Sequence, residues 1–303
     1  MTDMRVNIAG VELKNPVITA SGAFGYGMEY NEFYDISLLG GISCKGTTVL
    51  ERQGNPGPRI AETPSGMLNS VGLQNPGSEA FINTYLPWLR QRDITVIANV
   101  AGHSMDEYVE IVRRVSDAKV DMVELNISCP NVKEGGMSFG TSCESVEAVV
   151  SAVRKVCDRP LIVKLTPNVT DIGAIAQAAE AAGADAVSLI NTLTGMRIDI
   201  RTRRPILKNN IGGLSGPAVF PVAVRMVREV YKKVNIPIIG MGGVSTWEDA
   251  AEMMMAGASA IQVGAALFRD PYAPLKIIDG LKDFCEKQGL SSVSELTGTV
   301  EEW

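Results

Sequence analysis

The chain contains the stretch Met122-Val123-Glu124-Leu125-Asn126-Ile127-Ser128-Cys129-Pro130-Asn131, in which an apolar strand over 122–125 runs into a loop with a thiol between two carboxamides. Pro130 removes a backbone donor and favours an extended conformation at Cys129. Asn126 and Asn131 offer paired donors and acceptors that suit a planar amide or imide. A buried structural cysteine before a turn is the other interpretation, because free cysteine is among the most buried residue types.

The same pattern, a short apolar run that ends in Gly, Asn, Lys or Ser, recurs along the chain. Eight such runs are predicted to be strands: Val17–Thr19, Gly41–Cys44, Thr95–Ala98, Met122–Leu125, Leu161–Val163, Ala186–Ile190, Ile236–Ile239 and Ala260–Val263. Stretches with helical periodicity lie between them: Ser78–Leu89, Met105–Ala118, Ser145–Cys157, Ile172–Ala182, Pro217–Val234, Trp247–Ala256 and Tyr272–Gln288. Arg5–Ile8 and Val11–Leu13 predict a hairpin with a glycine turn ahead of the repeat.

Apolar strands that alternate with helices indicate a parallel sheet covered on both faces. Eight units favour an α/β fold closed into a (β/α)8 TIM barrel, with an N-terminal β-hairpin and long βα loops over its C-terminal face. A doubly wound sheet is the alternative, but no Gly-x-Gly-x-x-Gly motif follows the first strand. We expect residues 1–303 to form a single domain. The Gly/Pro-rich connection Gly46–Gly77 is a candidate functional loop.

Composition excludes several classes of protein. With 46% hydrophobic and 20% charged residues the chain can bury a large core, and its net charge of -6 argues against nucleic acid as a partner. Five scattered cysteines without a Cys-x-x-Cys pair predict a reduced, cytoplasmic protein, and no metal site is expected. Residues 1–14 lack the apolar centre of a signal peptide, and no membrane span is predicted.

Polar side chains follow several of the predicted strands. In a barrel of this type the chemistry lies at the C-terminal strand ends. Lys45 and Lys164 follow strands two and five, and Asn99, Asn126 and Asn191 follow strands three, four and six, so these five residues converge on one face. A surface role for either lysine is a poor interpretation, because each follows a core strand.

Glycine clusters mark a candidate phosphate site. Gly240–Gly243 and Gly264–Ala265 follow strands seven and eight, where barrels commonly bind phosphate, and Gly213–Pro217 adds a third group of backbone donors. Any one cluster is weak, because tight turns need glycine anyway, but three together favour a ligand. The three glycine clusters, with Lys164 at strand five, suit an FMN that lies across the barrel mouth. Lys164 would supply positive charge where the reduced flavin gains negative charge.

Five motifs together resemble the dihydroorotate dehydrogenase family: Asn126–Asn131, Gly66–Asn75, Lys45–Thr47, Ile190–Gly195 and Gly240–Gly243. The likeness covers nearly the whole chain. It implies oxidation of (S)-dihydroorotate to orotate on FMN in pyrimidine biosynthesis, with Cys129 as the general base that takes the C5 proton while the C6 hydride passes to the flavin. The membrane-associated branch has Ser at this position and an N-terminal membrane segment, so the chain resembles class 1. His103, the only histidine, is the rival base.

The resemblance also implies which residues contact each ligand. Substrate contacts are expected at Lys45, Asn69, Ser70, Val71, Gly72, Leu73, Asn126, Asn131, Asn191 and Thr192. Flavin contacts are expected at Ser21, Lys45, Gly46, Asn99, Asn126, Lys164, Ile190, Gly216, Gly242, Gly243, Gly264 and Ala265. The segments Thr194–Pro205 and Gly212–Pro217 are most similar to the NAD-linked class 1B. There, an iron-sulfur flavoprotein subunit with FAD and a [2Fe-2S] cluster passes electrons to NAD, and a homodimer core within a heterotetramer is expected.

Three alternatives stay open. A fumarate-dependent class 1A enzyme shares the same motifs. A dihydropyrimidine-type dehydrogenase has a similar cysteine loop, although it usually has His where this chain has Asn131. A catalytically silent barrel that serves as a scaffold subunit is the non-enzyme alternative. The basic run Arg197–Arg204 is either a solvated loop or an element that grips the site.

Overall fold

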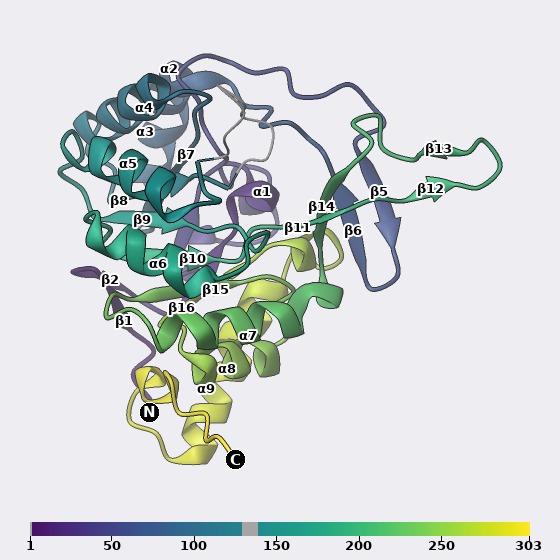
Figure 1. The fold of residues 1–303 in the computed structure, drawn as a ribbon. Helices are drawn as coiled ribbons and strands as arrows, with labels where there is room; N and C mark the ends of the chain where they lie inside the picture. Colours follow the sequence, from purple (N-terminus) through teal and green to yellow (C-terminus); the bar gives the residue numbers. More distant parts are fainter. Residues whose placement is uncertain (1, 129–138) are drawn as a thin grey trace.

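The protein is described by a computed structural model that covers residues 2–128 and 139–303 (Figure 1). Eight parallel strands close into a barrel in the order β10-β15-β16-β3-β4-β7-β8-β9. Their bounds are β3 Val17–Thr19, β4 Gly41–Ser43, β7 Thr95–Val100, β8 Met122–Asn126, β9 Leu161–Lys164, β10 Ala186–Leu189, β15 Ile238–Met241 and β16 Ala260–Val263. The predicted (β/α)8 barrel is confirmed, and no predicted strand end is wrong by more than two residues.

The largest shift is at β15, which begins and ends two residues later than predicted. Pro237 has no backbone N–H and cannot donate to the ladder. Its carbonyl accepts a hydrogen bond from Val187 N at 3.0 Å, and regular pairing with β10 begins at Ile238. At its other end the strand extends to Met241, which pairs with Gln262 of β16 and brings the following Gly242 to the rim of the barrel.

Helices surround the barrel on its outside (Figure 1). Their bounds are α1 Ser21–Phe24, α2 Gly77–Ala80, α3 Leu86–Arg90, α4 Met105–Asp117, α5 Cys143–Arg154, α6 Ile172–Ala181, α7 Phe220–Tyr231, α8 Trp247–Ala256 and α9 Ala273–Gln288. A π-helical turn, η3 Phe81–Tyr85, joins α2 to α3, so the helix predicted over 78–89 is present with one wider turn. Short 3-10 helices are η1 Tyr30–Glu32, η2 Ile36–Leu38, η4 Pro217–Val219, η5 Ala265–Phe268 and η6 Val293–Leu296.

Helix α4 shows how the sequence sets these helices. Ser104 caps its first turn by accepting from Glu107 N at 3.2 Å, and acidic residues in that turn favour the helix dipole. Tyr108, Ile111 and Val115 recur at helical spacing and are fully buried against the barrel. The helix is thus fixed by a cap at one end and by an apolar stripe along its length.

In the described residues, three further groups of strands lie outside the barrel. The hairpin of β1 Val6–Ile8 and β2 Val11–Leu13 is confirmed, and its two turn residues both have positive φ, as a type I′ turn requires. An antiparallel sheet, in the order β11-β14-β6-β5, stands beside the barrel mouth (Figure 1). Its strands are β5 Ile60–Thr63, β6 Gly66–Asn69, β11 Leu193–Gly195 and β14 Gly212–Ser215, while β12 Ile198–Asp199 and β13 Arg204–Pro205 form a projecting arm.

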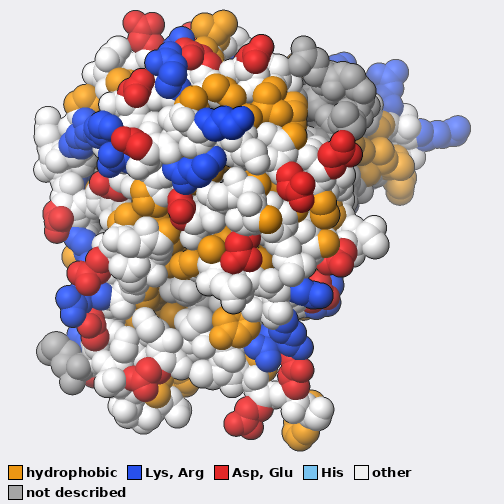
Figure 2. All heavy atoms as spheres, turned by 60° about the vertical axis from the view of Figure 1, so that its left-hand side comes forward, with side chains coloured by type: hydrophobic (Ala, Val, Ile, Leu, Met, Phe, Trp, Pro, Cys, Tyr) orange, Lys and Arg blue, Asp and Glu red, His pale blue; other side chains and the backbone are white. Residues whose placement is uncertain are grey.

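One face of the molecule carries charges of both signs. On the face that Figure 2 presents, Lys and Arg side chains are interspersed with Asp and Glu, and neither sign dominates the described part. None of the helices described in 2–128 and 139–303 has both the length and the apolar character needed to cross a bilayer.

Candidate active site

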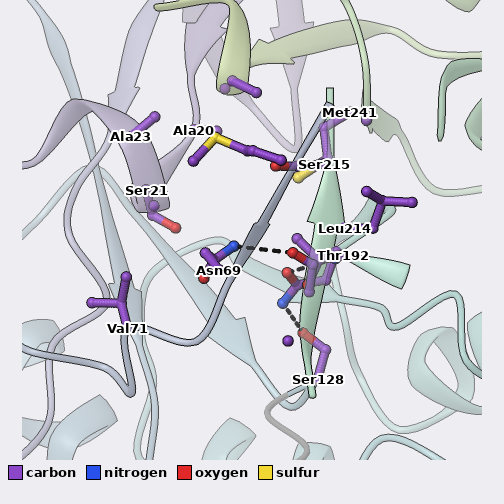
Figure 3. A pocket seen from close by; sticks show the side chains of 18 of the residues that line it. Ala20, Ser21, Ala23, Asn69, Val71, Ser128, Thr192, Leu214, Ser215 and Met241 are labelled. Carbon is purple, nitrogen blue, oxygen red and sulfur yellow. Dashed lines mark hydrogen bonds between the residues drawn. The ribbon is translucent and has the colours of Figure 1, made fainter. Parts of the chain in front are cut away.

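A cavity of about 300 Å³ opens at the carboxyl ends of the barrel strands, a place where barrel enzymes bind their ligands. Figure 3 shows Ala20 and Ser21 on one side of this cavity, Thr192 and Leu214 on the other, and Asn69 between them. Every described residue that was assigned to substrate or flavin lines it: Ser21, Lys45, Gly46, Asn69, Ser70, Val71, Gly72, Leu73, Asn99, Asn126, Lys164, Ile190, Asn191, Thr192, Gly216, Gly242, Gly243, Gly264 and Ala265.

Two lysine side chains bring positive charge to the cavity. Lys164 ends β9 and is only 5% exposed, and Lys45 lies two residues after β4. Burial, together with the nearby Lys164 ammonium and Arg59 guanidinium, lowers the pKa of Lys45 below its usual value. Because these cations repel one another, an anionic group next to Lys45 is favoured.

A buried carboxylate balances one of these lysines. Glu124 lies in the middle of β8, is fully buried, and its Oε2 lies 3.9 Å from Lys164 Nζ. Burial alone would raise the pKa of Glu124, but the Lys164 ammonium and side-chain hydrogen bonds hold it below its usual value. Glu124 is therefore ionised at neutral pH. Its carboxylate accepts hydrogen bonds from four side chains: Ser43, Asn99, Ser188 and Gln262.

The carboxamides of Asn126, which ends β8, and of Asn191, which follows β10, belong to a connected network. Ser128 Oγ donates to Asn126 Oδ1 at 2.7 Å, and Asn191 Nδ2 donates to Ser128 Oγ. Tyr108 OH fixes the same segment by donating to Asn126 O at 2.9 Å. The side-chain oxygen of Asn126 is engaged, and among the described residues no bond uses the Asn126 NH2 group, which can donate to a ligand.

The antiparallel sheet closes one side of the cavity. Asn69, at the end of β6, donates from Nδ2 to Gly213 O at 3.4 Å. A Cβ on Gly213 would overlap Thr192 Oγ1, so only glycine lets β14 lie this close. After β6 the chain turns through Gly72 and Leu73, which both have positive φ. Strand pairing thus holds the predicted substrate segment against the cavity.

Glycine turns form another part of the cavity rim. Gly216, Gly242 and Gly243 have φ values of 99°, 117° and 83°, a region that disfavours other residues. A Cβ on Gly243 would lie 2.7 Å from Phe220 Cβ and 2.9 Å from Gly216 O. Gly216 directly precedes η4, which runs into α7. Backbone free of side chains at a helix start suits a phosphate group.

Three buried oxygens at the cavity have no hydrogen-bond partner within the described residues: Ser70 Oγ, Asn99 Oδ1 and Gln262 Oε1. Buried polar atoms are rarely left unpaired, and each such loss costs about 1–3 kcal/mol. A ligand with N–H or O–H groups would satisfy them. The cavity as a whole therefore suits a ligand that combines an anionic group with several hydrogen-bond donors.

The remaining predicted residues have different outcomes. Cys129 and Asn131 fall outside the described residues, so their predicted roles stay predictions. His103, the rival base, is not among the described residues that line the cavity. Its backbone N donates to Glu107 Oε2 at 2.7 Å in the loop before α4. The basic run 197–204 belongs to the projecting arm and does not line the cavity in its described part either.

Sequence reasoning missed Glu124 and Gln262, which stand within strands that were read as apolar. The available signal was a single polar residue in the middle of a buried parallel strand, where water cannot solvate it. It also missed Asn168, which lines the cavity and donates from Nδ2 to Thr192 O at 3.1 Å.

Comparison with known proteins gives consistent matches. The family model described as "Dihydroorotate dehydrogenase" matches residues 3–285. The "Dihydroorotate dehydrogenase B (NAD(+)), catalytic subunit" of Parabacteroides distasonis is 55% identical over 302 residues, covering 99% of each chain. Proteins of the same name are 56% identical over 298 residues in Alkaliphilus metalliredigens, covering 98% of this chain and 99% of the relative, and 53% identical over 300 residues in Petrotoga mobilis, covering 99% and 100%.

Proposed function

The chain belongs to the dihydroorotate dehydrogenase family, and on that premise we propose that residues 1–303 act as a single FMN-binding domain, the catalytic subunit of an NAD-linked enzyme. The protein is an oxidoreductase that oxidises dihydroorotate in pyrimidine biosynthesis. One observation carries the assignment of the site: a cavity at the carboxyl strand ends combines Lys45 and Lys164 with carboxamides and glycine turns.

The cavity residues fit the proposed flavin. The unpaired Asn99 Oδ1 and Gln262 Oε1 can accept from N–H and O–H groups of FMN. The turns at Gly216 and Gly243 can accommodate its phosphate, because both glycines line the cavity without side chains and Gly216 directly precedes η4. When bound, FMN supplies an acceptor for the hydride from C6 of dihydroorotate.

The chain's own residues bind and orient the substrate. Asn126 offers an amide NH2 group, and the segment 69–73 closes over the cavity from the antiparallel sheet. Lys45, whose pKa is lowered by burial and by the nearby cations Lys164 and Arg59, binds the substrate carboxylate. Cys129 removes the C5 proton; its neighbour in the sequence, Ser128, lines the cavity.

Replacing Gly243 with alanine is expected to weaken FMN binding at least about tenfold, which corresponds to about 1.4 kcal/mol. The new Cβ would contact Phe220 Cβ and Gly216 O at 2.7 and 2.9 Å, so the phosphate turn must shift. Titration of the apoprotein with FMN, followed by flavin fluorescence, measures the change.

Gly10→Ala is the matched control, since Gly10 has a similar φ of 87° with nothing within 4 Å of a Cβ. It should cost about 1–2 kcal/mol of stability through backbone strain alone and leave FMN affinity unchanged. Equal FMN affinity in the two variants would argue against a phosphate at Gly243.

Orotate affinity is expected to fall at alkaline pH, and the fall should begin at a pH below the ordinary pKa of a lysine side chain. The pKa of Lys45 is lowered, so raising the pH neutralises this lysine early and removes the cation that faces the carboxylate. Lys45→Arg keeps its charge and should give a flatter profile. Orotate titrations from neutral to alkaline pH, read from the flavin spectrum, would show whether the two profiles differ; identical profiles would remove Lys45 from the carboxylate site.

We propose a separate electron-transfer subunit with FAD and a [2Fe-2S] cluster, in a heterotetramer with a homodimer core. Support comes from the relatives, which are named as NAD(+)-linked catalytic subunits. The part of the chain that is described contains no group of three or more His, Cys, Asp or Glu placed to hold a metal ion. The free thiols of Cys44, Cys157 and Cys285 support a cytoplasmic location.

Electron-acceptor assays test the proposed subclass. With dihydroorotate as donor, the isolated chain should give no fumarate-dependent turnover, and NAD reduction should appear only when the partner subunit is added. Rapid fumarate reduction by the isolated chain would instead indicate the class 1A enzyme.

A further inference from the structure

We propose that Glu124 is a positioning residue for the cofactor. Its carboxylate turns the amide oxygens of Asn99 and Gln262 toward the flavin and fixes the position of the Lys164 ammonium. The inference rests on the proposed FMN binding and extends it to a residue that does not itself line the cavity. Asn99, Gln262 and Lys164 do line the cavity, and they come from three different strands, β7, β16 and β9.

The carboxylate of Glu124 is saturated with donors. Its Oε2 accepts from Ser43 Oγ at 2.7 Å and Asn99 Nδ2 at 2.5 Å, and its Oε1 accepts from Ser188 Oγ at 2.7 Å and Gln262 Nε2 at 2.8 Å. All five residues are buried to 99% or more. An ionised carboxylate can only accept hydrogen bonds, so each amide must turn its nitrogen toward Glu124.

The opposite ends of both amides follow from this orientation. With their nitrogens bound to Glu124, Asn99 Oδ1 and Gln262 Oε1 point away from it, and neither has a partner in the described structure. Both side chains line the cavity. The carboxylate thus presents two fixed acceptors to a ligand that carries hydrogen-bond donors, as a flavin does on its ring and its hydroxylated chain.

Glu124 also restrains the position of the positively charged Lys164 side chain. Lys164 Nζ lies 3.9 Å from Glu124 Oε2, and the side chains of the two residues are 6% and 0% exposed. A long lysine side chain has many rotamers, and pairing with a fixed anion limits the positions of its ammonium. The same carboxylate therefore orients two neutral acceptors and one cation toward one ligand.

Glu124→Gln is the direct test, because it keeps the shape and removes the charge. A neutral amide has one oxygen for four donors, and its own NH2 group opposes the NH2 of Asn99 or Gln262. At least one of these amides should rotate and withdraw its oxygen from the ligand. We expect FMN affinity to fall on the order of 10- to 100-fold, with a shift in the visible spectrum of the flavin that stays bound.

Ser43→Ala and Ser188→Ala are matched controls. Each removes one donor to Glu124 without reversing an amide or changing a charge, so FMN affinity should stay within about threefold of the wild type. Thermal unfolding of all three apoproteins gives the folded fraction by which affinities are corrected. A loss in either serine variant as large as in Glu124→Gln would indicate a general structural role and overturn the proposal.

A swapped pair keeps the test decisive if Glu124→Gln fails to fold. In the double variant Glu124→Gln/Asn99→Asp, the new amide can donate to the carboxylate introduced on β7, whose second oxygen still faces the cavity, and the total charge is unchanged. This variant should bind FMN within about tenfold of the wild type. A folded swap that binds more than about 100-fold worse, or a Glu124→Gln variant with wild-type affinity and spectrum, would contradict the proposal.

The wild type separates this inference from the proposed function. If the wild type binds FMN, is bleached by dihydroorotate, and Glu124→Gln behaves identically, the role of Glu124 fails alone. If the wild type takes up no FMN, the proposed cofactor fails and the inference fails with it.

Discussion

Cys129→Ala is expected to slow the reduction of bound flavin by dihydroorotate about 10²–10⁴-fold at neutral pH, the usual contribution of a general base. A free thiol has a pKa of about 8.5 and is a few per cent thiolate at neutral pH, but a modest base suffices for a C5 proton that the neighbouring carbonyl acidifies. FMN content and orotate affinity should stay close to those of the wild type. Anaerobic stopped-flow mixing with dihydroorotate measures the rate.

Cys143→Ala provides the matched control. Cys143 begins α5, is partly buried and does not line the described cavity, so the same chemical change there should leave the reduction rate unaltered. Wild-type reduction kinetics in Cys129→Ala would remove the thiol from the mechanism and would bring His103 back as the rival base.

Lys164→Met should lower the free energy of unfolding by about 3 kcal/mol, because it leaves the buried carboxylate of Glu124 without its cation. Four hydrogen bonds still reach that carboxylate. The loss of unfolding free energy should therefore lie near the lower end of the range for broken buried ion pairs. The pH dependence has a definite sign. Without the ammonium, burial should raise the pKa of Glu124, so the deficit should be largest at neutral pH and shrink as the pH falls.

Two variants check this explanation by denaturant unfolding. Lys45→Met removes a cation that is repelled by Lys164, so it should not lower stability comparably. The double variant Lys164→Met/Glu124→Gln removes both charges and should regain much of the loss. A double variant less stable than Lys164→Met would show that the ion pair is not the cause.

The barrel could be predicted from the sequence because its signals are local. Each parallel strand is a short apolar run such as Leu161–Lys164. The helices that follow β7, β8, β9 and β15 each begin with a side-chain cap and carry an apolar stripe. The antiparallel sheet could not be predicted in this way. Its strands β11 and β14 are short and rich in glycine, and β14 pairs with β6 across about half of the chain.

The site residues that stand at the ends of barrel strands could be predicted from the sequence. Lys45, Asn99 and Lys164 stand at strand ends, and barrel geometry alone brings strand ends together. Glu124 and Gln262 could not be placed because their contact depends on side chains meeting across the barrel interior, between strands that are not neighbours in the sheet. A sequence shows that such residues are polar and buried, but it does not show which partners they share.

The central claim is that the cavity at the carboxyl strand ends holds FMN, which dihydroorotate reduces. The most direct measurement is the visible spectrum of the purified, FMN-loaded protein before and after dihydroorotate is added without oxygen. The claim predicts flavin absorption that bleaches on addition and returns with an electron acceptor. A protein that cannot be loaded with FMN, or a flavin band that dihydroorotate leaves unchanged, would contradict it.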